Sequence, residues 1–395
     1  MNTTPRRIRW ASLALACLLA LPLPWGVVAD FYVHLSPFLA LQSFLAHMPA
    51  LLFGLPAAVV LLLIIKWERW FCRHVCPTGA LCDAASACRR KRRSWDAFPR
   101  VNKALAVAAL AAAVCGAPAL ALLDPMALFH GAWAPVHQGP TLAAALGGAG
   151  LAAVLLLSLV FPRLWCARLC PLGGLQMLAA GMRRALTRAP APMETERAPL
   201  RDPALGRRGL FAAAAGIAGG LLLRRAAGGE RPSPLRPPGA LPEDRFALTC
   251  CRCGTCARVC PTRIVRPAFD VRDPIGLLAP EIEFSRGYCL PACNACSRAC
   301  PTGAIAPFEI EDKRRLFIGA ARIRLDGCLV VKGRECDRCV VSCEYHAIRI
   351  AGGIFDAAPE IDAARCVGCG ACAVVCPEGV VSVEPRRDLS AHATS

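Results

Sequence analysis

The sequence predicts a multi-domain protein. An α-helical transmembrane bundle, with four helices plus a signal or anchor helix, precedes a small, cysteine-rich α+β domain. Hydrophobic residues make up 55% of the 395 residues, and the mean hydropathy is +0.44, values typical of a chain partly embedded in a membrane. Four long apolar runs lie before residue 162, whereas 17 of the 25 cysteines lie after residue 249. We therefore expect a transmembrane domain at 1–186, a linker at 187–242 and a cysteine-rich domain at 243–395.

The four apolar runs are long enough to be transmembrane helices. They are residues 8–29, 49–65, 104–123 and 141–161. The connections 66–103 and 163–208 carry ten and nine Lys and Arg residues, whereas 30–48 and 124–140 carry none. Positively charged connections stay in the cytoplasm. This alternation predicts a multi-pass protein of the bacterial plasma membrane, with 30–48 and 124–140 on the outer side.

The net charge of +18 does not indicate a nucleic-acid partner. From Arg245 onward there are 20 basic and 17 acidic residues, so the cysteine-rich domain is nearly neutral. The positive excess lies beside the apolar runs, where it determines membrane orientation. We therefore expect a membrane partner and no nucleic acid.

Two segments of the membrane part repeat each other. The run from Arg69 to Gly79 resembles the run from Arg163 to Gly173, and each ends a predicted helical hairpin with a CxxxCP motif. Two thiols four residues apart share one face of a helix. The thiols of both copies are candidate ligands, at Cys72, Cys76, Cys166 and Cys170. They fit one metal or cluster site, two redox-active dithiols, or reduced structural cysteines.

The linker contains a second targeting feature. Arg207 and Arg208 precede an apolar run that ends at Leu223, as in a twin-arginine export signal placed inside the chain. Gly206 and Leu210 depart from the usual pattern, and a fifth transmembrane helix with basic flanks is the alternative. Both interpretations place the remainder on the periplasmic side, behind a Pro- and Gly-rich tether at 228–242.

The cysteine-rich domain contains four groups of four cysteines, three closely spaced and a fourth farther on. The groups are Cys250, Cys253, Cys256 and Cys260; Cys289, Cys293, Cys296 and Cys300; Cys328, Cys336, Cys339 and Cys343; and Cys366, Cys369, Cys372 and Cys376. Three of them end in Cys-Pro, the spacing of bacterial ferredoxins, in which the fourth cysteine usually binds a second cluster. Structural zinc sites more often use two separated CxxC pairs, and a disulfide framework would not produce such clustering. The sixteen thiols therefore predict four 4Fe–4S clusters.

Five cysteines fall outside these motifs. Cys17 and Cys115 lie within predicted spans and are expected to pack as small apolar residues. Cys251 is adjacent to the first group but out of register, and Cys82 and Cys88 have no assigned role.

The soluble part resembles the NapG/MauM ferredoxin-type proteins, which have a twin-arginine signal and four such groups. The widened third group, CLVVKGRECDRCVVSC, is especially similar to theirs. The membrane part resembles NapH-type quinol dehydrogenase subunits, with four helices and two CxxxCP motifs, so the chain resembles a NapH–NapG fusion. Two departures are the lack of cysteine in 174–206, where NapH-type proteins continue into a cytoplasmic ferredoxin domain, and the wider first gap of the second group.

The resemblance implies electron transfer from quinol to a periplasmic reductase or c-type cytochrome, as the quinol dehydrogenase component of a respiratory chain. The alternative is an assembly or maturation factor for a respiratory metalloenzyme. By resemblance to four-cluster reductase subunits, we expect the first and fourth groups to exchange Cys260 and Cys376, and the second and third to exchange Cys300 and Cys343.

The predicted topology separates the CxxxCP thiols from the four cysteine groups by a hydrocarbon core of about 30 Å. We therefore expect quinol to bind near the outer connections and electrons to bypass the inner thiols, so that replacing Cys72 or Cys166 impairs transfer less than replacing Cys369. Candidate proton acceptors in the outer connections are Asp30, His34, His47, Asp124, His130 and His137.

Overall fold

The computed structural model describes residues 4–21, 31–46, 54–88, 98–139, 141–187, 206–229, 234–285, 287–353 and 356–386. The structure is helix-rich with few, short strands, and it forms two compact units. The helical unit comprises Met1–Gly229, Asp244–Thr255 and Pro301–Ala304; the cysteine-rich unit comprises Glu230–Glu243, Cys256–Cys300 and Ile305–Ser395. The basic run at 89–93 and the linker at 188–205 lie outside the described residues.

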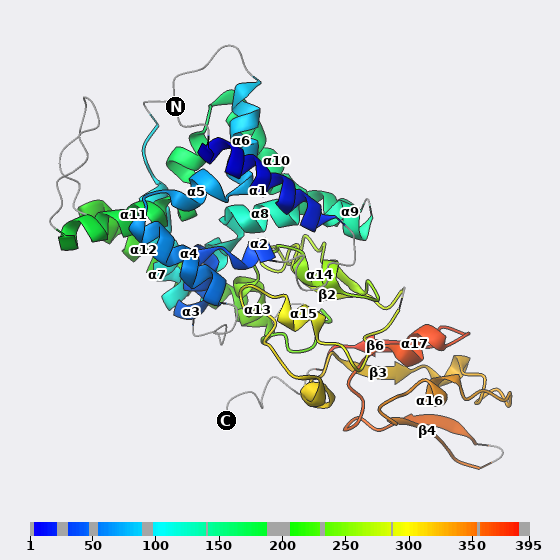
Figure 1. The fold of residues 1–395 in the computed structure, drawn as a ribbon. Helices are drawn as coiled ribbons and strands as arrows, with labels where there is room; N and C mark the ends of the chain where they lie inside the picture. The colour runs from blue at the N-terminus through cyan, green and yellow to red at the C-terminus, as the bar shows by residue number, and fades with distance from the viewer. Residues whose placement is uncertain are drawn as a thin grey trace. The chain divides into compact units, whose positions relative to one another are not determined.

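The helical unit is built from α-helices and two short turns of tighter or wider helix (Figure 1). They are α1 (Thr4–Ala20), α2 (Phe31–His34), α3 (Pro37–Leu45), α4 (Gly54–Lys66), α5 (Trp70–His74), α6 (Pro77–Ala87), α7 (Asn102–Val114), η3 (Ala119–Leu123), α8 (Pro125–Gly131), α9 (Ala134–Gln138), α10 (Leu142–Val160), η4 (Trp165–Leu169), α11 (Pro171–Thr187), α12 (Arg207–Ala227) and α13 (Glu243–Thr249).

The internal repeat predicted from the CxxxCP motifs extends into the backbone. From Cys72 to Cys166 the offset is 94 positions, and the same offset carries α6 onto the start of α11. Arg69 and Arg163, which are counterparts, both adopt the left-handed conformation with φ of 57° and 58°. That conformation is uncommon for a residue other than glycine. In each copy this residue lies shortly after the end of the preceding helix, at Lys66 and Val160, and begins the turn into the CxxxCP segment.

Cysteine-proline pairs start the second helix of each copy. Cys76 is the N-cap of α6 and Pro77 its first residue, and Cys170 and Pro171 stand at the same places before α11. Proline is tolerated at the first helical position because its missing N–H would have no partner there. The motif therefore ends one short helical segment and begins the next helix.

The helical unit contains two helices that are long and apolar enough to cross a membrane, α10 and α12, among the described residues. Helices α4 and α7 have 13 residues each, or about 20 Å, against about 30 Å of hydrocarbon. The Thr78 hydroxyl donates a hydrogen bond of 2.5 Å to the Pro125 carbonyl. This contact contradicts the expectation that the segment after Cys76 and the segment after Asp124 lie on opposite sides of a hydrocarbon core.

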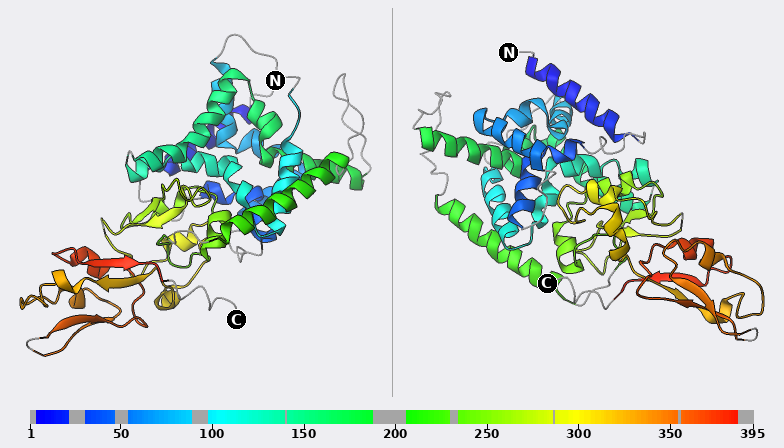
Figure 2. Two further views of the ribbon diagram at one scale, coloured as in Figure 1. Left: turned by 180° about the vertical axis from the view of Figure 1, so that it is seen from behind. Right: turned by 60° about the horizontal axis from the view of Figure 1, so that its bottom comes forward.

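Helix α12, which begins with the pair Arg207 and Arg208, packs along α7 in both views of Figure 2. Gly216 and Gly220 of α12 face Ala108 and Ala112 of α7. A Cβ atom at Gly216 would lie 2.2 Å from the Ala108 carbonyl oxygen, so the backbones touch. Small residues permit such close approach between helices in a membrane.

Replacing Gly216 with leucine is expected to destabilise the protein by about 3 kcal/mol, because the new side chain must push the α7 backbone away. The midpoint of thermal unfolding of the full chain in detergent measures this. Gly219→Leu is the matched control, since nothing lies within 4 Å of a Cβ atom there. Equal midpoints for the two variants would show that α12 does not pack on α7 through Gly216.

The cysteine-rich unit is held by three antiparallel two-stranded sheets and short helical turns. The strands are β1 (Val265–Pro267), β2 (Pro280–Ile282), β3 (Ala320–Ile323), β4 (Ile348–Ala351), β5 (Ala358–Ile361) and β6 (Val381–Glu384), and the helical turns are α14 (Thr255–Val259), α15 (Ala295–Arg298), η5 (Ile310–Arg315), η6 (Leu325–Gly327), α16 (Arg338–Val341) and α17 (Ala371–Val375). Strand β1 pairs with β2, β3 with β6, and β4 with β5. Val265 is opposite Ile282, Ala320 opposite Glu384, and Ile348 opposite Ile361. The small apolar cores are lined by cysteines, which suits a domain organised around clusters.

Candidate cluster-binding sites

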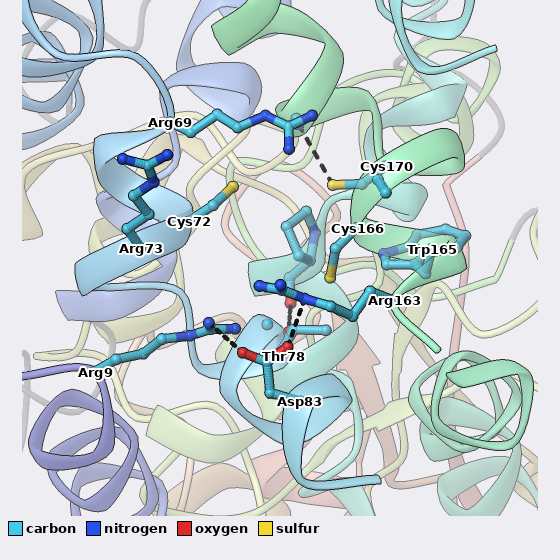
Figure 3. Close-up of a pocket in the computed structure, with 14 residues that line it drawn as sticks. Arg9, Arg69, Cys72, Arg73, Thr78, Asp83, Arg163, Trp165, Cys166 and Cys170 are labelled. Atoms are coloured by element: carbon cyan, nitrogen blue, oxygen red, sulfur yellow. Dashed lines mark hydrogen bonds and ion pairs between the residues drawn. The ribbon is translucent and has the colours of Figure 1, made fainter. Parts of the chain in front are cut away.

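The CxxxCP thiols of both repeats meet in the helical unit. Cys72, Cys166 and Cys170 line one cavity of about 370 Å³, and the sulfurs of Cys72 and Cys170 point toward each other in Figure 3. The Cys76 thiol is close enough to Cys72 and Cys170 for the charges of the three groups to interact. The structure therefore brings together the four thiols that the sequence left as candidates.

Backbone amides support the second thiol of each motif. The Gly79 N–H donates to Cys76 Sγ at 3.3 Å, and the Gly173 N–H donates to Cys170 Sγ at 3.5 Å. Both bonds lie at the start of a helix, where the partial positive charge favours a thiolate. N–H···S bonds of this kind also surround the thiolate ligands of iron–sulfur clusters and tune their potentials.

Each repeat also contacts the first thiol of the other. Gln176 Nε2 donates to Cys72 Sγ at 3.0 Å, while the Cys82 thiol shares a hydrogen bond with the Cys166 thiol. Cys82 and Gln176 occupy the same position in the two copies, six residues after the second cysteine of each motif. The four thiols thus lie near an approximate two-fold relation between the repeats, and Cys82 adds a fifth, fully buried thiol beside them.

The cavity has a positively charged wall. Arg9, Arg69, Arg73 and Arg163 line it, against a single acid, Asp83, among its lining residues. Asp83 pairs with Arg9 at 2.6 Å and with Arg163 at 2.8 Å. Four guanidinium groups against one carboxylate leave an excess of three positive charges among the lining residues. An anionic cluster held by the four thiolates would supply the balancing negative charge.

Burial raises the pKa of the Cys72 thiol, and the Gln176 hydrogen bond and the nearby Arg69 guanidinium oppose this. Burial also raises the pKa of Cys76 and Cys170. A bound cation would favour the thiolate forms of these groups. The indole N–H of Trp165, which lines the cavity, has no hydrogen-bond partner among the described residues. A cluster with sulfide atoms fits this donor set, because sulfides accept hydrogen bonds and irons compensate the thiolates.

The candidate proton acceptors of the outer connections make intramolecular hydrogen bonds. Asp124 caps α8, and its carboxylate accepts from Ser36 Oγ at 2.6 Å and from the Met126 N–H at 2.8 Å. His130 Nδ1 lies 2.9 Å from the Met126 carbonyl, and His137 Nε2 lies 2.8 Å from the Ala20 carbonyl. Burial lowers the pKa of His34 to about 4. Asp30 and His47 lie outside the described residues.

In the cysteine-rich unit, three sets of four thiols each line one small pocket. The sets are Cys260 with Cys289, Cys293 and Cys296; Cys328, Cys336 and Cys339 with Cys376; and Cys343 with Cys366, Cys369 and Cys372. Each set takes three thiols from one group and the fourth from a neighbouring group. This is the exchange expected of ferredoxin motifs.

The expected partners of the exchange were wrong. Cys260 joins the second group rather than the fourth, and Cys343 joins the fourth group rather than the second. The physical reason is the local sheet: β4 and β5 form a hairpin between the third and fourth groups, and β3 and β6 pair their outer ends. The hairpin of β1 and β2 lies between the first and second groups in the same way. Groups that are adjacent in sequence are therefore folded together.

A backbone hydrogen bond joins the second and fourth groups. The Cys289 N–H donates to the Cys369 carbonyl at 2.9 Å. The Gly368–Cys369–Gly370 loop is close-packed there, because a Cβ atom at Gly370 would lie 2.2 Å from Phe284. The pocket lined by Cys289 and Cys296 and the pocket lined by Cys369 and Cys372 are therefore connected by one backbone hydrogen bond.

The beginning of the first group belongs to the helical unit. Cys251 and Cys253 are buried in the same apolar core as Cys76 and Cys170. The Ser43 hydroxyl of α3 donates to the Thr302 carbonyl at 3.0 Å, which ties the segment Pro301–Ala304 to α3 within that unit. Cys251, expected to be a bystander, is therefore a core residue.

Four residues beside the thiol sets were not identified from the motifs: Cys82, Gln176, Asp83 and Lys313. The first three would have emerged had the repeat been extended past the CxxxCP motifs at the same offset. Arg69 contacts Met177 Sδ at 3.2 Å, and its counterpart Arg163 contacts Asp83, the counterpart of Met177. Lys313 carries no sequence signal, because it lies outside every cysteine group.

Comparison with known proteins agrees with this geometry. A family model described as a 4Fe-4S binding domain matches residues 48–95 and again 143–189, the two CxxxCP hairpins. A model described as a 4Fe-4S dicluster domain matches residues 332–380, where the third and fourth groups exchange their last cysteines. No solved structure matches the chain.

The matching relatives are ferredoxin-type proteins. Methylamine utilization ferredoxin-type protein MauM of Methylobacillus flagellatus is 33% identical over 208 residues, which are 46% of this chain and 81% of the relative. Ferredoxin-type protein NapG of Escherichia coli K12 is 33% identical over 214 residues, 48% of this chain and 85% of the relative. Ferredoxin-type protein NapF of the same organism is 33% identical over 154 residues, 38% of this chain and 84% of the relative.

The thiol sets and these matches define an iron–sulfur protein that transfers electrons through 4Fe–4S clusters. Such clusters move single electrons at potentials set by charge, hydrogen bonds and exposure. The chain belongs to the family of ferredoxin-type proteins that includes NapG and MauM.

Proposed function

We propose that this protein is a membrane-anchored electron-transfer protein that accepts electrons from quinol and passes them to a periplasmic reductase or c-type cytochrome. One observation carries the proposal: the loop of the first cysteine group is buried in the core that also holds the CxxxCP thiols. A chain that only attached a ferredoxin to a membrane would not need this shared core. A chain that conducts electrons from a site in its helices to its ferredoxin clusters would need such a shared core.

The sixteen ferredoxin cysteines would hold four clusters, and Cys72, Cys76, Cys166 and Cys170 would hold a fifth. Three ferredoxin sets follow from the pockets described above. With one 4Fe–4S cluster per set, the full chain would contain about twenty iron and about twenty sulfide.

The order of the clusters follows from their contacts. Electrons would enter at the CxxxCP site and reach the first group through the helical core. The exchanged Cys260 leads to the second group, the Cys289–Cys369 contact leads to the fourth, and the exchanged Cys343 and Cys376 lead to the third. The set of the third group, Cys328, Cys336 and Cys339 with Cys376, would be the exit for electrons. Val341, in the same short helix as Cys339, is 77% exposed.

This route replaces the expected bypass of the inner thiols. The bypass depended on a full hydrocarbon core between the CxxxCP segment and the outer connections, and the Thr78–Pro125 hydrogen bond contradicts that separation. The helical part would correspond to a NapH-type subunit fused to the NapG/MauM-type part. The alternating basic connections, together with α10 and α12, support a multi-pass membrane location with the cysteine-rich unit on the periplasmic side.

The proposal predicts that a water-soluble quinol reduces the clusters of the full chain within seconds in anaerobic membranes. Bleaching of the visible absorption measures this reduction, and dithionite gives the full extent. Membranes containing the same amount of a chain with Cys76 and Cys170 both replaced by alanine are the control. Reduction by dithionite but not by quinol would overturn quinol oxidation and favour an assembly or maturation role.

A further inference from the structure

Lys313 lies outside the cysteine groups, in η5, yet its side chain enters the second one. Its ammonium group donates to the carbonyls of Leu290 and Cys293, the latter at 2.5 Å. Both carbonyls belong to the loop that connects Cys289 to Cys296. A third hydrogen bond joins the ammonium to the Cys289 thiol. All three donors of the lysine are therefore directed at one cluster-binding loop.

No carboxylate among the described residues pairs with the Lys313 ammonium. The side chain is 4% exposed. Its neighbours Glu311 and Asp312 are exposed and do not pair with it. A buried cation without a counter-ion is costly, so buried charges are normally paired. Three carbonyl or thiol acceptors satisfy its donors but leave its charge uncompensated.

We propose that Lys313 is the counter-charge of the cluster held by Cys260, Cys289, Cys293 and Cys296, and that it raises the reduction potential of that cluster above those of its neighbours. A cluster with four thiolates is negatively charged, and each electron it accepts adds another negative charge. A fixed positive charge in contact with one thiolate favours the reduced state, and more strongly in a buried site than in water. The role of Lys313 requires only that the second group binds a 4Fe–4S cluster. The position of that cluster in the electron route rests on the proposed function.

The consequence concerns the middle of the route. The second cluster is the one whose Cys289 N–H contacts the Cys369 carbonyl. A raised potential there would make it the first cluster to hold an electron at equilibrium. Electrons would then collect at the second cluster, between the entry and the exit of the route. This cluster is in contact with the fourth group through the Cys289–Cys369 hydrogen bond.

Lys313→Met in the otherwise unchanged full chain tests the proposal. Mediated redox titration followed by electron paramagnetic resonance should show one cluster signal shifted to lower potential. The expected shift changes the ratio of reduced to oxidised cluster at least tenfold, which is 59 mV for a one-electron couple. The signal that shifts should be the one lost in Cys293→Ala. Arg314→Met is the matched control, because Arg314 is the exposed neighbour.

Lys313→Gln and Lys313→Arg separate charge from shape. Glutamine keeps donors for the carbonyls but removes the charge, and arginine keeps the charge. Full iron content with unchanged potentials in both Met and Gln variants would overturn the proposal. Loss of about four iron in both, with retention in the Arg variant, would support a requirement for the charge. Loss in the Arg variant as well would overturn it, since shape alone would then matter. The titration uses dithionite and mediators, so its outcome is independent of quinol oxidation.

Discussion

Replacing Cys72 or Cys166 with alanine is expected to lower quinol-dependent reduction of the ferredoxin clusters by at least about 100-fold, beyond the range seen when only an outer-shell partner of a metal ligand is lost. The two thiols belong to different repeats and line the same cavity as Cys170, with the Cys76 thiol nearby. Removal of either would leave three ligands for the proposed fifth cluster and would interrupt the proposed route at its entry. Stopped-flow reduction of membranes by a soluble quinol measures the rate.

Cys88→Ala is the matched control, because Cys88 is an exposed thiol at the end of α6. The alanine variants should also lose about four iron per chain, while dithionite still reduces the remaining clusters. A variant with normal quinol-dependent rates and normal membrane levels would show that electrons bypass the CxxxCP site. Loss of all cluster signals would instead identify a folding defect, and Cys72→Ser, which keeps the size of the side chain, would then be the variant to measure.

Cys343→Ala is expected to remove the cluster of the fourth group, not that of the third group in which Cys343 lies. The structure places Cys343 with Cys366, Cys369 and Cys372. Combining Cys343→Ala with Cys369→Ala should therefore cost no more iron than either change alone, about four per chain. Combining it with Cys339→Ala should cost about eight, because Cys339 belongs to the other set.

Iron and sulfide analysis of anaerobically purified full-length protein distinguishes the two double variants. Changes at one site are non-additive when they remove the same object. The pairing expected from four-cluster reductase subunits makes the opposite prediction: Cys343→Ala with Cys296→Ala would lose about four iron rather than about eight. That result would contradict the sets described here. Cys251→Ala provides the control for a cysteine outside the sets.

Much of the site was predictable from local sequence. Cluster ligands are arranged within a few residues of one another, so the spacing of Cys366, Cys369 and Cys372 predicts a ferredoxin loop, and the matching family models agree. The CxxxCP repeat was likewise visible, because each copy carries the same short motif after an apolar run. Helix starts at Pro77 and Pro171 follow from the same residues, since a cap and a proline act on their own turn.

The pairing of the ferredoxin groups depended on contacts that no motif records. The fourth cysteine follows the third by the same number of positions in every group, so this spacing does not decide which group it joins. The choice is made by the β1–β2 and β4–β5 hairpins, which fold adjacent groups together. Lys313 could not be found from sequence for a similar reason: its ammonium reaches the Cys289 loop through the fold, and a lysine in a charged stretch ordinarily stays in water.

The sequence by itself determined that this is an iron–sulfur protein with sixteen ferredoxin cysteines and two CxxxCP motifs, because ligand spacing is a local property. Only the tertiary structure decided that the CxxxCP thiols converge, that Thr78 reaches Pro125, and that Cys251 and Cys253 are buried in the same core. Charge alternation assigns connections to sides of a membrane but does not give the depth to which a segment returns between helices. That depth is set by side-chain packing. Because the packing places the CxxxCP thiols and the start of the first cysteine group in one core, the two predicted sites become parts of one proposed electron route.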